Sequence, residues 1–292
     1  MSKSGISYLA AGSKEDRLFK GMNLRTKTLI TTGLTVVLLM LIIAGNFTLS
    51  ADNISTNFEI KNQPPSAVNL FGTDWLGRDM FTRTVKGLNI SLAVGMIASF
   101  VSAVIALVLG ISAATLGKRV DGLVTWLIDL FLGVPHLVII ILIAFAMGGG
   151  IRGVIVGVAV THWPSLARVI RAEVMQLRSA DYIQVAQKLG KSRWWIATKH
   201  LLPHLAPQFF IGLILLFPHA ILHEAGISFL GFGLSPETPA IGIILSESMR
   251  YLSTGMWWLA FFPGLALLVM VRSFDILGSN LLLLFDPHRA RE

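Results

Sequence analysis

The sequence has no cysteine and is poor in charged residues. Without cysteine the chain can form neither disulfide bonds nor thiolate metal sites, and it has no cysteine nucleophile. Only 14% of the 292 residues are charged, whereas a soluble protein usually carries about 25%. The chain is 54% hydrophobic and has a mean hydropathy of +0.71. These proportions argue against a soluble globular domain.

Long apolar runs are what the sequence has in abundance. A helix needs roughly 20 apolar residues to cross a hydrocarbon core, whereas a spanning strand needs only about 10 alternating residues. Six windows are long enough, or nearly so, for helices: 28–51, 87–117, 130–151, 153–167, 201–223 and 251–271. The expected fold is therefore an all-α integral membrane protein with six transmembrane helices, the third of them kinked at Pro135.

The net charge of +8 raises the possibility of a nucleic-acid partner. If the N-terminus is cytoplasmic and six helices alternate, 18 of the 24 Lys and Arg residues fall on the inner side. This is the positive-inside bias of membrane proteins. The basic excess therefore indicates topology, with both termini cytoplasmic, and nucleic-acid binding is not expected.

The charge pattern and the windows divide the chain into consecutive regions. The first apolar stretch is longer than the roughly 7–15 residues of a signal-peptide core, so we interpret it as a retained anchor. The predicted regions are a cytoplasmic tail (1–27), a first transmembrane helix (28–51), a periplasmic segment (52–86), a transmembrane core (87–285) with a cytoplasmic loop (178–203), and a cytoplasmic C-terminal tail (286–292). Within the periplasmic segment, residues 71–79 predict a turn that leads into a short helix through Arg83.

The loop 178–203 is a polar, basic island between apolar spans. Tyr182, Val185, Ala186 and Leu189 recur at the spacing of one helical face, and Gln184 lies on the other. Such a helix can lie on the membrane surface or insert its small face into a groove of a soluble protein. The small side chains on this face favour the second interpretation.

The same loop resembles the loop of binding-protein-dependent permeases that docks on an ATPase, which has the pattern E-A-A-x3-G-x9-I-x-L-P. Gln184-Val185-Ala186 stands at the E-A-A, Gly190 at the glycine and Leu202-Pro203 at the closing pair. The glutamate is missing, so no ionic contact is expected at Gln184. The resemblance implies an ATPase-coupling helix with these residues: Asp181, Tyr182, Gln184, Val185, Ala186, Leu189, Gly190 and Pro203.

Further stretches resemble the second permease subunit of peptide and nickel importers: residues 71–79, Ile90-Ser-Leu with Gly95, 167–171, 228–233 and Asp286-Pro287. The resemblance implies a type I ABC importer permease fold in the bacterial inner membrane. It also implies four kinds of partner, namely a homologous permease subunit, two cytoplasmic ATPase subunits, an extracytoplasmic solute-binding protein and the lipid bilayer. The chain itself would be no enzyme and hold no cofactor, because ATP and magnesium would bind the ATPases.

Two short motifs that suggest bound nucleotide or zinc fail on inspection. Gly190-Lys191-Ser192 resembles the end of a phosphate-binding loop, but the position that needs the first glycine is Val185. His223-Glu224 resembles a zinc-protease helix, but the second histidine would fall on Ile227. Neither motif therefore indicates chemistry on this chain.

The candidate substrate-pathway residues are histidines in the apolar spans, together with Glu224. His219 and His223 lie one turn apart with Glu224 adjacent, and such a pair can bind a metal, line a cavity, or only make structural hydrogen bonds. His162 and His136, beside Pro135, can face the same pathway. The local patterns resemble the nickel branch, which favours nickel or another transition metal, carried as a chelate and held by His219 and His223. The alternative cargo is a di- or oligopeptide, and an ion-driven secondary transporter is a weaker hypothesis because no inverted repeat is visible.

Overall fold

The computed structural model describes residues 24–285, and all regular elements within this range are helical. The predicted tails lie largely outside it, as does the Asp286-Pro287 match. The long helices are α1 (Leu24–Thr48), α2 (Met80–Thr115), α3 (Lys118–Gly133), α5 (Gly150–Arg178), α8 (Leu202–Phe229) and α10 (Trp258–Phe285). The shorter elements are η2 (Ala51–Ile54), η3 (Phe58–Ile60), α4 (His136–Ala146), α6 (Asp181–Lys188), α7 (Arg193–Ile196), η4 (Ala197–Leu201), α9 (Ile241–Met249) and η5 (Leu252–Thr254).

Five helices of the described chain are long and apolar enough to cross a membrane, and α3 with α4 adds a sixth span if the bent pair counts as one. The predicted all-α fold with six spans is thereby confirmed. The kink at Pro135 is larger than predicted, because α3 and α4 are separate helices bent by 98°. Proline disfavours helical backbone in the residue before it, and Val134 is extended with φ −106° and ψ 141°.

Several helices extend beyond the predicted windows. The short helix expected to end at Arg83 is continuous with the second span, since α2 runs from Met80. The stretch between the predicted windows 87–117 and 130–151 forms most of α3, which begins at Lys118. A window of apolar residues ends at the first charge, whereas a helix continues for as long as its backbone hydrogen bonds do. Helix α9, between the fifth and sixth spans, was not predicted.

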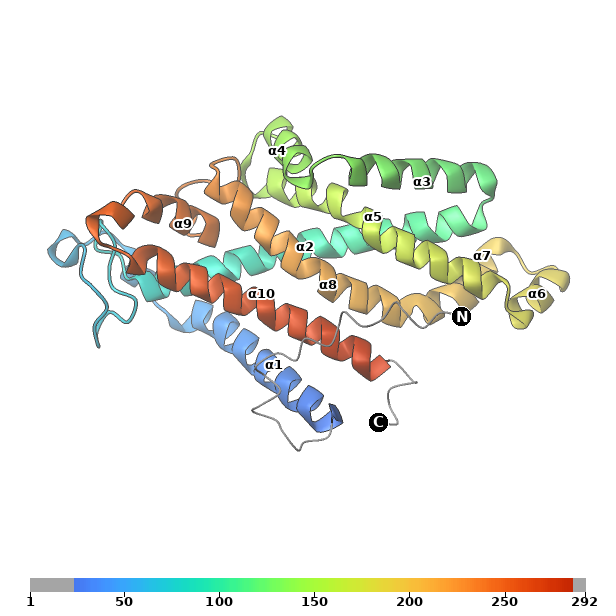
Figure 1. Cartoon of the computed structure of the whole chain (residues 1–292), viewed down its shortest axis with the longest axis horizontal. Helices are drawn as coiled ribbons and strands as arrows, with labels where there is room; N and C mark the ends of the chain where they lie inside the picture. The colour runs from blue at the N-terminus through green and yellow to red at the C-terminus, as the bar shows by residue number, and fades with distance from the viewer. Residues whose placement is uncertain (1–23, 286–292) are drawn as a thin grey trace, which may run out of the picture.

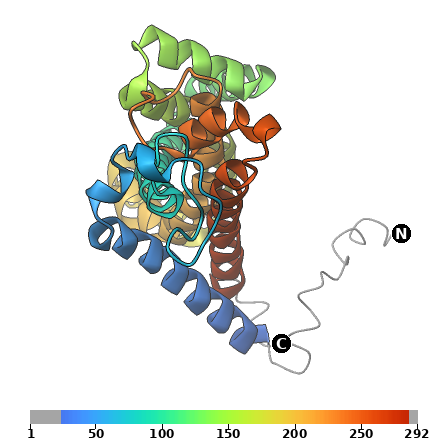
Figure 2. The same ribbon diagram turned by 90° about the vertical axis from the view of Figure 1, so that its left-hand side faces the viewer.

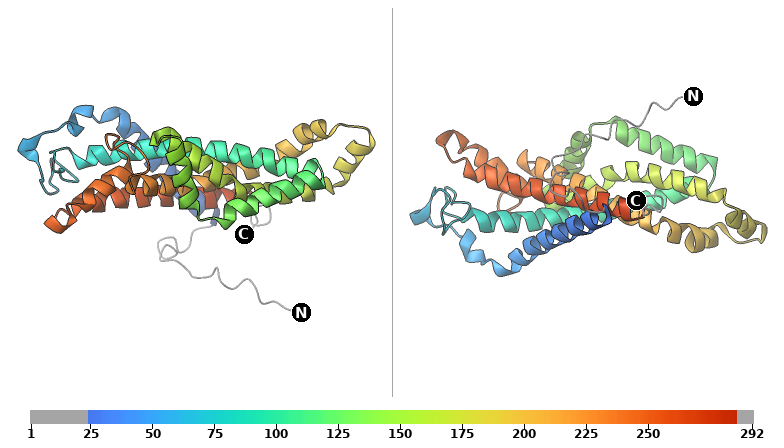
Figure 3. Two further views of the ribbon diagram at one scale, coloured as in Figure 1. Left: turned by 90° about the horizontal axis from the view of Figure 1, so that it is seen from above. Right: turned by 60° about the horizontal axis from the view of Figure 1, so that its bottom comes forward.

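The long helices α2, α5, α8 and α10 run side by side along the long axis of the molecule (Figure 1). At one end of this bundle lie residues 51–79 and α9, and at the other end α6 and α7 project beyond the spans (Figure 3). Helix α1 packs against α10 on one side of the bundle and α3 lies on the opposite side (Figure 2). Gly95 and Gly110 allow α2 to approach its neighbours closely, because an added Cβ would meet Ile221 or Ile170.

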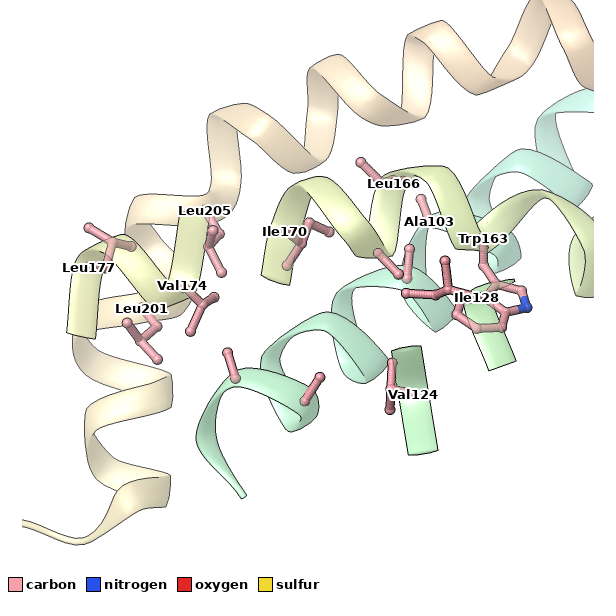
Figure 4. Packing of buried hydrophobic residues seen from close by; sticks show 14 of the residues in the cluster. Ala103, Val124, Ile128, Trp163, Leu166, Ile170, Val174, Leu177, Leu201 and Leu205 are labelled. Atoms are coloured by element: carbon pink, nitrogen blue, oxygen red, sulfur yellow. The ribbon is translucent and has the colours of Figure 1, made fainter. Parts of the chain in front are cut away.

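A core of aliphatic side chains joins α2, α3, α5 and α8 near the α6 end of the bundle (Figure 4). Ile128, Ile170, Leu201 and Leu205 are almost completely buried in it. The same cluster extends to Ile183 of α6. The helix that projects from the bundle is therefore anchored in the core of the membrane-spanning part.

Candidate functional site

Helix α6 ends in a turn that its sequence specifies. The amides of Gly190 and Lys191 donate to the carbonyls of Gln187 and Ala186, at 3.0 and 3.1 Å. These two bonds form the C-terminal cap in which the residue after the helix is left-handed. Gly190 has φ +74°, a conformation that glycine adopts without the strain of a side chain. The glycine that the coupling motif requires thus reverses the chain after α6.

The exposed side of α6 differs from the face predicted by spacing. Ile183 and Ala186 are buried against the core, with exposed fractions of 0% and 7%. Tyr182, Val185 and Leu189 are exposed at 47%, 54% and 72%. Ala186 therefore anchors the helix to its own chain and cannot belong to a free docking face as the spacing suggested. The exposed apolar side chains are the ones that offer a surface to another protein.

Gln184 of α6 and the helix α7 complete the part of the chain that projects beyond the spans. Gln184, which replaces the expected glutamate, donates from its side chain to the carbonyl of Ser179 at 3.0 Å. In α7, Trp194 is 78% exposed whereas Ile196 is buried. Pro203 occupies the second position of α8, where no backbone donor is needed. The helix is nevertheless continuous from Arg193 to Phe229, so the fifth span begins before Pro203 and before the predicted window 201–223.

Three histidines from three helices meet in the middle of the bundle. The ring centroid of His162 in α5 lies 4.8 Å from that of His223 in α8 and 5.5 Å from that of His136 in α4. Nδ1 of His162 lies 3.0 Å from the carbonyl oxygen of Val158, so a hydrogen bond there places the proton on Nδ1 and leaves Nε2 as an acceptor. His219, which the spacing paired with His223, is exposed one turn away.

Within residues 24–285, no group of three or more His, Cys, Asp or Glu residues is arranged to hold a metal, and this range includes the three histidines. Glu224 is fully buried and its hydrogen bond comes from the hydroxyl of Ser228, at 2.9 Å. That hydroxyl also accepts from the amide of Leu234, at 3.2 Å. Glu224 thus fixes the end of α8 to the loop before α9.

Two contacts between ionisable side chains on different spans are exposed and were not predicted. Arg168 of α5 and Asp129 of α3 lie 3.0 Å apart, with side chains 57% and 63% exposed. Glu173 of α5 and His204 of α8 lie 3.6 Å apart, with side chains 39% and 52% exposed. In the sequence, the only sign of such contacts is a charged residue at the edge of an apolar window. That charge marks where the window ends and does not identify its partner.

At the opposite end of the bundle a buried ion-pair network joins the segment 71–83 to α9. Arg83 donates to Asp74 at 3.0 Å and to Glu247 at 2.7 Å, and its side chain is 3% exposed. Arg78 donates to Asp74 at 2.6 Å. Asp74 therefore pairs with both arginines, and Asp79 caps α2 by accepting from the amide of Thr82 at 2.8 Å. No local pattern in the sequence identifies Glu247 of α9 as a partner of Arg83.

The comparison with known proteins covers almost the whole chain. Residues 106–289 match a family described as "Binding-protein-dependent transport system inner membrane component". The dipeptide transport system permease protein of Bacillus subtilis (strain 168) is 33% identical over 270 residues, which make up 92% of this chain and 84% of that protein. The oligopeptide transport system permease protein of the same strain is 30% identical over 268 residues, 91% of this chain and 88% of that protein. A probable D,D-dipeptide transport system permease protein of Escherichia coli (strain K12) is 28% identical over 276 residues, 94% and 91% of the two chains.

Proposed function

We propose that this chain, which belongs to the family of binding-protein-dependent transport system inner membrane components, carries dipeptides or short oligopeptides. Like its relatives, the chain is a permease subunit of an ABC importer and is not an enzyme. The observation that supports a peptide cargo is that relatives 28–33% identical over about nine-tenths of the chain are named as dipeptide or oligopeptide permeases.

The nickel hypothesis has less support. None of the reported relatives is named for a metal. A neutral imidazole can instead donate to or accept from a peptide. We therefore propose that His136, His162, His219 and His223 line the cargo pathway, while a metal site at His219 and His223 stays a prediction.

In the proposed mechanism, α6 transmits the movement of an ATPase to the spans. ATP and magnesium bind the ATPase subunits, and their closure moves α6 through its exposed residues Tyr182, Val185 and Leu189. The helix is fixed to the membrane core by Ile183, so its displacement is passed to α5 and α8. Packed helices of this kind shift between discrete arrangements as rigid bodies, which is what alternating access requires.

The proposed assembly contains this chain, a homologous permease, two ATPase subunits and a solute-binding protein in the bacterial inner membrane. The α6 end faces the cytoplasm, where both termini also lie, and residues 52–86 with α9 face the binding protein. Helix α1 presents exposed apolar side chains along its length, among them Leu34, Met40 and Leu41. Such side chains suit lipid or the partner permease.

An uptake assay tests the cargo. Cells without their own peptide importers would express this chain with its partner subunits and receive a labelled dipeptide or radioactive nickel. We expect the dipeptide to accumulate, and accumulation to stop when the ATPase lysine that binds phosphate is replaced. Nickel uptake that depends on ATP and is unaffected by excess dipeptide would overturn the peptide proposal and restore the nickel hypothesis.

A further inference from the structure

A small basic cavity lies where α6 and α7 meet the ends of α2 and α5 (Figure 1). Its volume is about 270 Å³. Three of the residues that line it are basic, namely Arg178, Lys191 and Arg193, and Thr115 adds a hydroxyl group. No acidic residue of the described chain lines it. Pockets that enclose a whole small molecule measure roughly 300–1,000 Å³, so this cavity suits a single anionic group.

The positive charge of the cavity is not balanced by the chain itself. Within residues 24–285, none of the three cations forms an ion pair with a carboxylate. Arg178 donates one hydrogen bond, to the carbonyl of Ala114 near the end of α2, out of the five N–H donors of a guanidinium. Nζ of Lys191 lies 5.0 Å from the ring centroid of Trp195, a contact that uses no acceptor. Like charges held together without a counter-charge repel one another, so an anion in the cavity would be favourable.

The cavity lies on the side of α6 that faces away from the proposed ATPase contact. Gln187 lines the cavity, whereas Val185 and Leu189 are the exposed side chains proposed to meet the ATPase. Gln187 is two residues from each of them, and two residues turn an α-helix by about 200°. An ATPase bound to Val185 and Leu189 therefore leaves the cavity on the membrane side of α6.

The surroundings of the cavity suit the surface of a bilayer. Trp194, which follows Arg193, is 78% exposed, and tryptophan is enriched at the level of the lipid head groups. Thr115 is the last residue of α2, so the cavity lies at the depth where a span ends. Leu116, the next residue, is 52% exposed. Exposed apolar side chains beside three cations match the two parts of a lipid, its acyl chains and its phosphate.

We propose that this cavity binds the phosphate of an anionic phospholipid, with Arg178, Lys191, Arg193 and the hydroxyl of Thr115 as donors. Basic pockets at the cytoplasmic ends of membrane helices bind anionic head groups in this way. Because the cations come from α5, from the turn after α6 and from α7, a bound phosphate joins the projecting helices to the bundle. The site requires only that the α6 end lies at a membrane surface, so it does not depend on the cargo.

The test measures the binding of fluorescent phosphatidylglycerol and phosphatidylcholine to the purified importer complex in detergent micelles. The wild type should prefer phosphatidylglycerol. Each basic residue near an anionic lipid surface contributes about fivefold in affinity, so K191Q/R193Q should bind this lipid at least about tenfold more weakly. The charge-retaining variant K191R/R193K should bind it as the wild type does. The matched control is K188Q/K199Q, which removes two lysines that do not line the cavity and should bind it normally.

Free phosphate shares the chemistry of the lipid head group, so inorganic phosphate and glycerol phosphate serve as competitors. Neither should displace phosphatidylglycerol at equal concentration, because neither has acyl chains to place beside Trp194 and Leu116. Displacement at equal concentration would overturn the lipid proposal in favour of a soluble anion.

Three further results would also overturn the site. Unchanged lipid binding in K191Q/R193Q would show that the cavity is not used, and an equal loss in K188Q/K199Q would indicate general attraction to a basic surface. Loss of the ATPase from purified K191Q/R193Q, with lipid binding intact, would assign the cations to the ATPase contact. Failure of the wild type to take up any dipeptide would remove the proposed cargo and leave the lipid result unaffected.

Discussion

The buried network at Arg83 and the exposed pair at Arg168 use the same chemistry for different purposes. Each joins an arginine to a carboxylate on another segment at 3.0 Å. Arg83 is 3% exposed at the side chain and holds two elements together, whereas Arg168 is 57% exposed and is screened by solvent. Burial, and not the presence of a salt bridge, decides which charges maintain the fold. Helix α6 shows the same contrast, with Ile183 buried and Leu189 exposed.

The largest effect should come from the buried network. Replacing Arg83 with methionine would remove the more deeply buried of the two cations, Arg83 and Arg78, that Asp74 and Glu247 share, and breaking a buried pair costs about 3–5 kcal/mol. The free energy of unfolding would be measured in detergent by denaturant titration. R168Q is the matched control and should cost at most about 1 kcal/mol. Equal losses of unfolding free energy in R83M and R168Q would show that burial does not decide how much these two ion pairs stabilise the fold.

A smaller loss is expected when α6 loses its anchor. Ile183 is fully buried, so Ile183→Ala should lower the free energy of unfolding by about 2–5 kcal/mol through lost burial and a cavity. The same titration measures it, with Val185→Ala as the exposed control one half-turn away. If both variants unfold alike, α6 is not anchored through Ile183.

The capping glycine should have a lesser effect. Gly190→Ala would place a side chain at φ +74° and cost about 1–2 kcal/mol. Gly122 in α3 has no neighbour within 4 Å of an added Cβ and no positive φ. Gly122→Ala should therefore be neutral or stabilise the protein by about 0.5–1 kcal/mol. Equal thermal shifts for the two variants would mean that the backbone at Gly190 is not constrained.

The smallest effect on stability should come from the exposed side of α6. Leu189 is 72% exposed, so Leu189→Ser should change the free energy of unfolding by no more than about 0.5 kcal/mol. Since the side chain is proposed to contact the ATPase, peptide uptake should still fall several-fold and less ATPase should co-purify. Unchanged uptake and unchanged co-purification would exclude Leu189 from the docking surface.

Much of this arrangement could be predicted because it depends on local pattern. Apolar length predicts the spans, and the pattern around Gly190 predicts where α6 ends. Pro135 marks the break between α3 and α4, although its 98° angle depends on packing. Such features follow from residues close together in the chain.

The remaining features depend on contacts between distant segments. Spacing along one helix paired His219 with His223, but the closer ring neighbour of His223 is His162 on α5. Glu247 lies 164 residues from Arg83, and no local pattern connects them. The buried side of α6 was misplaced for the same reason, because periodicity shows which residues share a face and not which face meets the core.

The anchoring of α6 by Ile183 and Ala186 has a consequence for how such importers diverge. Side chains on its outward side can change without loss of folding, since the core contacts and the Gly190 turn remain. A duplicated permease could therefore switch to a different ATPase through a few surface replacements. The specificity of the permease for its own ATPase could then change without change in the membrane bundle. Chimaeras that exchange only Tyr182, Val185 and Leu189 should bind a different ATPase.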